Sequence, residues 1–579
     1  MGKGQVMAPT VDAAKERLTH ENARGQSGTR GFPLPDADAW TKRRQNKQNR
    51  LAAVRHWMKG PIVSSDRIIQ TLERLIRPED RVVMEGDNQK QADFLSRSLV
   101  AVNPKKIHDL HLIISTIGRP EHLTLFELGI ARKVDFSFAG PQSLRVAQLL
   151  EDGVLEIGAI HTYIELYARL FVDLIPDVVL VCAEKADREG NLFTGPNTED
   201  TPTIVEAAAF HDGIVIVQVN EIVERLDRVD IPESWVDVVV QADKPFYVEP
   251  LFTRDPRHIT DVQILIAMMM IRGVYERHQL RALNHGIGFD TAAIELLLPT
   301  YGEALGLRGK ICRHWALNPH PTLIPAIESG WVESVYSFGS EVGMDDYVRA
   351  RPDVFFTGHD GSLRSNRVLC QLAGQYAVDA FIVATLQMDA DANSSTVTTG
   401  RLAGFGGAPN MGHDPHGRRH TSKAWLDLKV DPSPVARGRK IVVQTVETFS
   451  KGGVPALVET LDAVEVGRKS GMPIAPVMIY GDDVSHVVTE EGIAYLYKAE
   501  GIEERRRALA AVAGVSPIGL KAKPEETAAL RRKGVVAYPE DIGVHRLQAN
   551  RSLLAARSME DLVAWSGGLY QPPAKFRSW

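Results

Sequence analysis

The sequence is poor in cysteine, with Cys182, Cys312 and Cys370 as the only thiols in 579 residues. They lie far apart and show no C-x-x-C spacing, which argues against a disulfide scaffold or a zinc knuckle. Long hydrophobic runs are also missing, since the longest, residues 264–271, is far shorter than the roughly 20 residues of a membrane helix. The N-terminus has no apolar signal core. We therefore expect a soluble protein of the reducing cytoplasm that does not contact a membrane.

An excess of charge of one sign is missing as well. With 67 Lys plus Arg against 73 Asp plus Glu, the formal net charge is −6, so no strong field favours nucleic acid or an anionic surface. Any phosphate site must therefore be local. A content of 44% hydrophobic residues is ordinary for a folded protein, and 579 residues are too many for one core. We expect at least two domains and no nucleic-acid partner.

From Ile68 onward, strand-like apolar runs alternate with helical stretches. The runs lie at residues 81–85, 109–115, 134–139 and 177–182, and again at 309–313, 353–357, 380–385 and 439–445. Alternation of this kind predicts an α/β fold with open, mainly parallel sheets flanked by helices.

An internal repetition suggests where the chain divides. Residues 82–95 and residues 283–296 each run from a strand end through a glycine turn into a helix, and a proline-rich segment lies between the two halves. A site would then lie in the crevice between the halves, near strand ends. We predict an N-terminal extension at 1–60, α/β domains at 61–250 and 251–514, and a helical C-terminal extension at 515–579.

Two glycine clusters are the first candidates for chemistry. Gly286, Ile287 and Gly288 follow an apolar strand, and Gly406 and Gly407 belong to a second cluster. Glycine turns can present bare N–H groups to a bound anion or oxyanion. Neither cluster is a dinucleotide fingerprint, because a proline interrupts the second and no suitably spaced acid follows either. The alternative is that both are plain tight turns.

Polar residues near these turns or at strand ends are further candidates. Gln218 and Asn220 end an apolar strand, where an α/β site usually places side chains, although such residues are often merely solvated. Asn410 and His413 follow the second cluster, and Arg418 lies in the charged loop after it, where it could pair with a carboxylate or phosphate. Three histidines and an aspartate lie within residues 413–420, but their spacing matches no zinc signature. We expect no metal.

Several stretches carry a resemblance to known proteins. They are Gly190-Asn191, Gln218-Val219-Asn220, Gly286-Ile287-Gly288, Gly404-Phe405-Gly406-Gly407 and residues 487–494, and two further stretches, residues 85–95 and 406–414, are more specific. Over residues 81–511 the sequence resembles the acyl-CoA hydrolase and family I CoA-transferase group, and the two specific stretches make the closer resemblance one to malonate decarboxylase alpha subunits. The resemblance implies two tandem CoA-transferase-like domains with N- and C-terminal extensions.

The resemblance implies an acyl-carrier-protein transferase that exchanges acetate for malonate on the thiol arm of a carrier protein. That arm is a dephospho-CoA derivative, and the chain itself is expected to bind no cofactor. The implied partners are the acyl carrier protein and the malonyl-ACP decarboxylase subunits of a complex. We expect catalytic roles for Gly286, Ile287, Gly288, Gly406, Gly407 and Asn220, and substrate contacts from Gln218, Asn410, His413 and Arg418.

One departure from the family pattern bears on the mechanism. CoA transferases of this group carry a nucleophilic glutamate after the first glycine turn, whereas residues 312–316 contain no acid. Malonate could instead attack the acetyl thioester directly, giving a mixed anhydride that the released thiolate then attacks. Two alternatives stay open. One is a hydrolase or CoA transferase that uses Glu85 or Glu341, and the other is a non-catalytic scaffold subunit.

Overall fold

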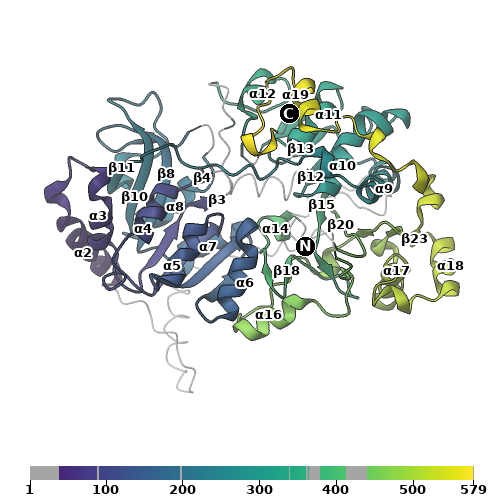
Figure 1. The fold of residues 1–579 in the computed structure, drawn as a ribbon, viewed down its shortest axis with the longest axis horizontal. Helices are drawn as coiled ribbons and strands as arrows, with labels where there is room; N and C mark the ends of the chain where they lie inside the picture. The colour runs from purple at the N-terminus through teal and green to yellow at the C-terminus, as the bar shows by residue number, and fades with distance from the viewer. Residues whose placement is uncertain are drawn as a thin grey trace, which may run out of the picture.

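The computed structural model describes residues 38–577, except for residues 88–89, 196–197, 338, 360–362, 364–377, 412–439 and 451. Two halves, each a sheet with its helices, lie side by side (Figure 1). The predicted α/β class with mainly parallel sheets is confirmed. The predicted site residues His413 and Arg418 lie outside the described residues. No helix in the described parts of the chain is long and apolar enough to cross a bilayer.

The first half is built on a sheet that has nine strands within the described residues. Their order is β1-β11-β10-β8-β2-β5-β6-β7, with parallel pairing throughout, and β9 pairs antiparallel with β8. The strands are β1 (Ile62–Val63), β2 (Arg81–Met84), β5 (Leu110–Thr116), β6 (Ala131–Phe138), β7 (Glu156–Ile160), β8 (Val178–Ala186), β9 (Leu192–Phe193), β10 (Ile214–Ile222) and β11 (Val238–Gln241). The helices are α2 (Ala39–Ala52), α3 (Ile68–Leu75), α4 (Asp93–Val100), α5 (Pro120–Glu127), α6 (Ser143–Glu151), α7 (Tyr163–Val172) and α8 (Thr201–Phe210).

Strand β8 explains the apolar run that the sequence shows at residues 177–182. Val179 and Val181 face the core beneath α7 and α8, whereas Leu180 and Cys182 face the core beneath α3 to α6. Because helices cover both faces of the sheet, the first six residues of β8, Val178 to Ala183, are all apolar and buried, and the half-buried Glu184 and Lys185 come only near its end.

The second half is built on a sheet that has eight strands within the described residues, in the order β14-β13-β12-β15-β20-β21-β22-β23. The pairing is parallel except for the last two ladders. The strands are β12 (Ala282–His285), β13 (His314–Ala316), β14 (Ser334–Tyr336), β15 (Ala380–Ala384), β20 (Ile441–Thr445), β21 (His486–Val488), β22 (Ile493–Ala494) and β23 (Val536–Ala537). The helices are α9 (Asp261–Met270), α10 (Phe289–Leu297), α11 (Ile324–Glu328), α12 (Asp345–Ala350), α14 (Ala408–Met411), α16 (Asp462–Ser470), α17 (Ile502–Ala511), α18 (Pro524–Lys533) and α19 (Met559–Trp565).

The two sheets have the same strand topology around their central strands. Apart from the short edge strand β1, each half starts from a central strand, β2 between β5 and β8 and β12 between β13 and β15. The chain then adds strands on one side and crosses to the other, which creates a topological switch point beside each starting strand. The repetition predicted from residues 82–95 and 283–296 is thus visible as two equivalent central strands, whose carboxyl ends are where such sheets bind ligands.

The two terminal segments pack on the halves. On α2, the guanidinium of Arg50 holds the carboxylate of Asp80 with hydrogen bonds of 2.5 and 3.0 Å, and both side chains are buried. At the other end of the chain, Tyr570 is fully buried against the second half, where its hydroxyl lies 3.4 Å from that of Thr253. The described parts of both terminal segments therefore pack on the halves.

Some predicted elements are wrong. The strand expected at 309–313 is a turn, because Gly309 and Cys312 have φ of 74° and 58°, and the strand β13 begins only afterwards. Within 353–357, Phe355 makes an isolated bridge but no strand forms. Residues 515–579 are not all helical, since β23 adds an edge strand to the second sheet.

A glycine loop of the second half is docked on the first half. The carbonyl oxygen of Ser137 accepts hydrogen bonds from the N–H groups of Phe405 at 2.7 Å and Gly406 at 2.9 Å. Gly404 pairs with Phe138 at the end of β6. Its φ is +76°, and a Cβ there would overlap the Ser137 carbonyl. The close approach of the two halves therefore requires glycine at this position.

Gly404→Ala should destabilise the protein more than Gly400→Ala. Both glycines have a left-handed φ, +76° and +80°, but a Cβ on Gly400 would meet no atom within 4 Å. Each alanine therefore carries about 1–2 kcal/mol of backbone strain, and only the Gly404 variant also separates the halves. Denaturant unfolding measures both losses. Equal losses would contradict a role of Gly404 in docking.

Candidate active site

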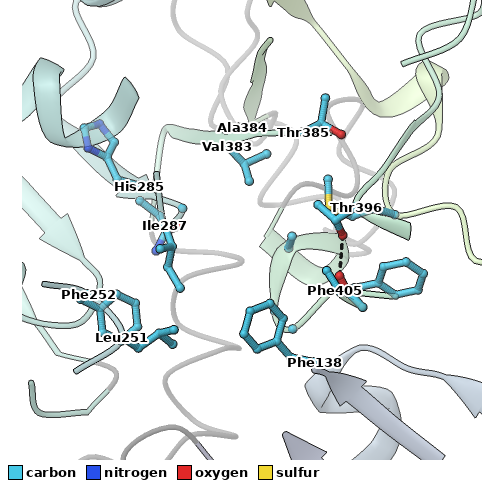
Figure 2. Close-up of a pocket in the computed structure, with 18 of the residues that line it drawn as sticks. Phe138, Leu251, Phe252, His285, Ile287, Val383, Ala384, Thr385, Thr396 and Phe405 are labelled. Atoms are coloured by element: carbon cyan, nitrogen blue, oxygen red, sulfur yellow. Dashed lines mark hydrogen bonds between the residues drawn. The ribbon is translucent and has the colours of Figure 1, made fainter. Parts of the chain in front are cut away.

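The carboxyl ends of the central strands of the second sheet open into a cavity of about 360 Å³ between the halves. Figure 2 shows Ile287 and Phe252 on one side of this cavity and Phe405 and Phe138 on the other. Phe138 and Tyr163 come from the first half. The cavity lies in the crevice that the sequence predicted as the place of the site. Its other walls come from the ends of β12 and β15 and from the segment that contains Leu251 and Arg254. The remaining lining residues are Leu317, Asn318, His320, Thr385, Leu386, Thr396, Arg401, residues 403–408 and Met478.

Both predicted glycine turns reach this cavity. Gly286 and Ile287 line it after β12, and Gly406 and Gly407 line it in the docked loop. Gly288 lines a small recess beside it. The structure thus brings together two turns that are about 120 residues apart in sequence, as a shared site requires.

Two of the glycines cannot serve as donors, however. The N–H of Gly286 donates to the carbonyl of Ile382 at 2.7 Å, and the N–H of Gly406 donates to Ser137 at 2.9 Å. A Cβ on Gly286 would lie 2.8 Å from a methyl group of Val383. Gly286 is therefore needed for the close packing of β12 on β15, and the expectation that its N–H faces a substrate is corrected.

The remaining N–H groups of the turns are available. In the described part of the chain, those of Ile287, Gly288 and Gly407 have no protein acceptor. Gly288 is the N-cap of α10 with φ −177°, so the positive end of the helix dipole lies at the same turn. These three N–H groups are the ones that can stabilise an anion or oxyanion.

A buried carboxylate behind β12 holds two histidines. Oε1 of Glu295, on α10, lies 2.9 Å from Nδ1 of His285 and 2.9 Å from Nδ1 of His320, and Oε2 accepts the hydroxyl of Thr322 at 2.5 Å. Nε2 of His285 lies 2.7 Å from the hydroxyl of Tyr275. Burial opposes the charge of Glu295, but the charge of His320 and the hydrogen bonds of both histidines hold its pKa well below the usual range. Glu295 is therefore ionised.

Arg254 brings positive charge to the cavity. It lines both the cavity and the recess, and its Nη1 donates to the carbonyl oxygens of Leu251 at 2.7 Å and Thr253 at 2.9 Å. Burial lowers the pKa of Arg254 and the charges of Glu341 and Glu295 raise it, but a guanidinium stays charged at neutral pH. Among the described residues, Arg254 forms no ion pair within 4.0 Å, so its charge is available to an anionic ligand.

The two carboxylates considered as nucleophiles lie elsewhere. Glu85 is fully buried in the first sheet, where it accepts the N–H of Cys182 at 2.8 Å and the hydroxyl of Thr201 at 2.5 Å. Glu341 accepts the N–H and hydroxyl of Thr253 at 3.0 and 2.7 Å, and burial raises its pKa to about 7. Among the described residues that line the cavity there is no Asp or Glu.

The predicted residues Gln218 and Asn220 do not line the cavity. The fully buried Gln218 accepts the N–H of Leu95 at 3.0 Å, and Asn220 accepts the N–H of Phe246 at 2.9 Å. Both side chains hold segments of the first half together. Asn410 lies next to the docked loop on α14, buried, and its Nδ2 has no partner in the described part of the chain.

The sequence also suggested that no metal is bound. The described residues contain no group of three or more His, Cys, Asp or Glu side chains that could hold one. The histidine-rich segment 413–420 lies outside those residues, so this expectation stays a prediction.

Sequence reasoning missed Arg254, Glu295 and His320. His320 follows β13 closely, where a polar residue after a strand is a usable signal. The strand was expected at 309–313, however, so its end was placed several residues too early. Arg254 lies in the segment between the halves and has no periodic context that could identify it.

Gln218→Ala should lower the free energy of unfolding by about 1–3 kcal/mol, because it leaves the buried N–H of Leu95 without an acceptor. Gln241→Ala is a matched control, since that side chain is exposed and makes one long contact of 3.4 Å. Its effect should stay within about 0.5 kcal/mol. Denaturant unfolding of both variants is the measurement. If Gln218→Ala unfolds with the same free energy as the unsubstituted chain, the Gln218 side chain has no structural role.

Comparison with known proteins adds the family. The family model described as malonate decarboxylase, alpha subunit, transporter matches residues 39–579. A curated protein of Malonomonas rubra, acetyl-S-ACP:malonate ACP transferase, is 55% identical over 546 residues, which cover 93% of this chain and 98% of that protein.

Solved structures agree with this result. A chain of a Pseudomonas malonate decarboxylase hetero-tetramer in complex with malonate has 69% sequence identity and a TM-score of 0.89, covering 94% of this chain and 100% of that one. A malonate decarboxylase alpha subunit from Acinetobacter baumannii has 66% identity and a TM-score of 0.87, covering 93% and 100%.

Proposed function

The chain belongs to the malonate decarboxylase alpha-subunit family, and from this we propose that it is an acyl-carrier-protein transferase. It converts acetyl-S-ACP and malonate to malonyl-S-ACP and acetate. The observation that carries the proposal is the 55% identity to a transferase of this name along almost the whole chain. Purified chain, acetylated carrier protein and malonate test it, with malonyl carrier protein detected by mass spectrometry. Failure to form this product would favour the scaffold alternative.

The chain acts within a complex. The hetero-tetramer of the Pseudomonas relative supports a multisubunit assembly, in which the carrier protein and the malonyl-ACP decarboxylase subunits are the partners. The chain binds no cofactor of its own and acts on the dephospho-CoA-type arm of the carrier. We place the complex in the cytoplasm, where the buried thiols of Cys182 and Cys312 stay reduced.

Arg254 holds the carboxylate of malonate that does not react. Its Nη1 is occupied by the two backbone carbonyls, which leaves the edge formed by Nε and Nη2 facing away from them. That edge matches a carboxylate in a bidentate pair. Malonate carries two negative charges and acetate one, so this contact would distinguish the incoming acid from the outgoing one.

Acyl transfer proceeds directly between the two acids. The free carboxylate of malonate attacks the acetyl carbonyl and forms a mixed anhydride, and the released thiolate attacks the malonyl carbonyl and expels acetate. Each step passes through a tetrahedral oxyanion, which the N–H groups of Ile287, Gly288 and Gly407 stabilise. One such donor contributes about 3–4 kcal/mol. The absence of a carboxylate among the described lining residues supports this route over a glutamyl thioester.

Arg254→Gln should raise the KM for malonate by about 10- to 150-fold, the equivalent of one charge-assisted bidentate pair of about 1.5–3 kcal/mol. Exchange of labelled acetate into acetyl-S-ACP should be nearly unaffected, because acetate has no second carboxylate. Arg257→Gln, an exposed arginine paired with Asp255 on the same segment, is the control and should match wild type. Equal losses in transfer and exchange would assign Arg254 another role.

The direct route also predicts where the oxygen of acetate comes from. In a single turnover with excess enzyme and malonate labelled with ¹⁸O in both carboxylates, the acetate released should contain one ¹⁸O, the bridging atom of the mixed anhydride. An enzyme glutamate would instead supply unlabelled oxygen in the first turnover. Mass spectrometry of the acetate decides between them. Unlabelled acetate formed together with malonyl carrier protein would establish the double-displacement route.

A further inference from the structure

His320 has one ring nitrogen that the protein does not use. The ring lines the cavity, is 5% exposed and stacks on Phe252 with centroids 5.2 Å apart and planes 20° apart. Its Nδ1 lies 2.9 Å from Oε1 of Glu295. Its Nε2 is buried and has no partner among the residues that the structure describes. The ring is therefore held by its face and by one nitrogen, and only Nε2 remains for a ligand.

Glu295 decides which nitrogen carries a proton. An ionised carboxylate can only accept, so Nδ1 of His320 must donate. Nε2 is then the ring nitrogen that can exchange a proton with a ligand. His285 binds the same carboxylate oxygen, but the hydroxyl of Tyr275 occupies its Nε2 and burial lowers its pKa. Of the two histidines, His320 is the one that can exchange a proton with a ligand.

The recess beside the cavity places His320 close to the proposed machinery. Ile287, Gly288, Arg254 and His320 all line it. The charged or titratable groups that face the imidazole are Glu295 from α10, His285 from β12 and Arg254 from the segment before α9, with Glu341 behind Thr253. Oxyanion donors, a cation for malonate and an imidazole nitrogen thus surround one point.

The transfer reaction also has to stabilise the leaving thiolate, which the N–H groups proposed for the oxyanion do not do. Breaking the acetyl thioester leaves a thiolate in a cavity with largely apolar walls, where burial disfavours a bare anion. If the thiolate took a proton from water it would lose its nucleophilicity before the second step. A nearby imidazolium can hold the thiolate as an ion pair, as cysteine–histidine pairs do.

We propose that His320, oriented by Glu295, is the proton-holding partner of the carrier thiol. This inference rests on the proposed function. As the malonate oxygen bonds to the acetyl carbon, the C–S bond breaks and its electron pair goes to sulfur, which takes up or shares the Nε2 proton of imidazolium. In the second step sulfur bonds to the malonyl carbon, acetate leaves with the C–O electron pair, and the proton returns to Nε2. No proton is gained or lost overall.

The acidity of the leaving thiol tests this role. His320→Gln should lower malonate-dependent turnover of acetyl-S-ACP by about 100-fold or more. S-acetyl-4-nitrothiophenol releases an aromatic thiolate that is stable without a proton. With this thioester the same variant should lose less than about 10-fold of its turnover rate, measured from the colour of the released thiolate. Arg254→Gln should lower the malonate-dependent turnover rate by the same factor with both thioesters. His111→Gln, which removes another carboxylate-paired histidine, should leave both rates unchanged.

A second measurement needs no variant. In the unsubstituted chain, acetyl thioesters of graded thiol acidity should react at rates that depend only weakly on that acidity. A steep dependence, an unchanged rate of His320→Gln, or equal losses of that variant with both thioesters would overturn the role. Loss of transfer in the unsubstituted chain would instead overturn the proposed function itself, and this role with it.

Discussion

The contact of one glycine loop with the end of one strand brings the two halves together at the cavity. The carbonyl of Ser137 accepts two consecutive N–H groups of the 403–406 loop, so the second half contributes backbone to the edge of the first. Because Gly404 has no side chain, the two backbones approach closely enough for Phe138 and Tyr163 to complete a cavity that otherwise belongs to the second sheet. Without this contact the cavity beside the glycine turn after β12 would lose the wall that Phe138 and Tyr163 provide, and the N–H groups of the turn would gain less over water.

Two buried glutamates show how neighbours decide the charge of this site. Glu295 is surrounded by two imidazoles and stays ionised, whereas Glu341 receives only neutral donors and has a pKa raised to about 7 by burial. The first carboxylate can therefore orient a histidine by charge. The second anchors the backbone next to Arg254 and is only partly ionised near pH 7, so it offsets the guanidinium incompletely. The cavity consequently favours a dianion over a neutral molecule.

The sequence predicted the parts of the fold that depend on local pattern. Apolar runs of central strands and the repeated strand–turn–helix openings were recognisable, because both faces of those strands are buried. It failed where two left-handed residues, Gly309 and Cys312, replaced an expected strand, and this error concealed His320. Gln218 and Asn220 were misjudged for another reason. A polar residue at a strand end looks the same in sequence whether it meets a substrate or the N–H of a neighbouring helix. Residues such as Arg254 and Glu295 meet only through the fold.

The cavity walls come from both halves, and this has a thermodynamic consequence. A ligand that touches Phe138 and Tyr163 on one side and Ile287 on the other loses its contacts when either half unfolds. Its binding free energy is therefore added to the coupling between the halves. Occupancy should make melting of the molecule more cooperative, so that two cores which could open separately when empty behave as a single unit while an acyl group is in transit.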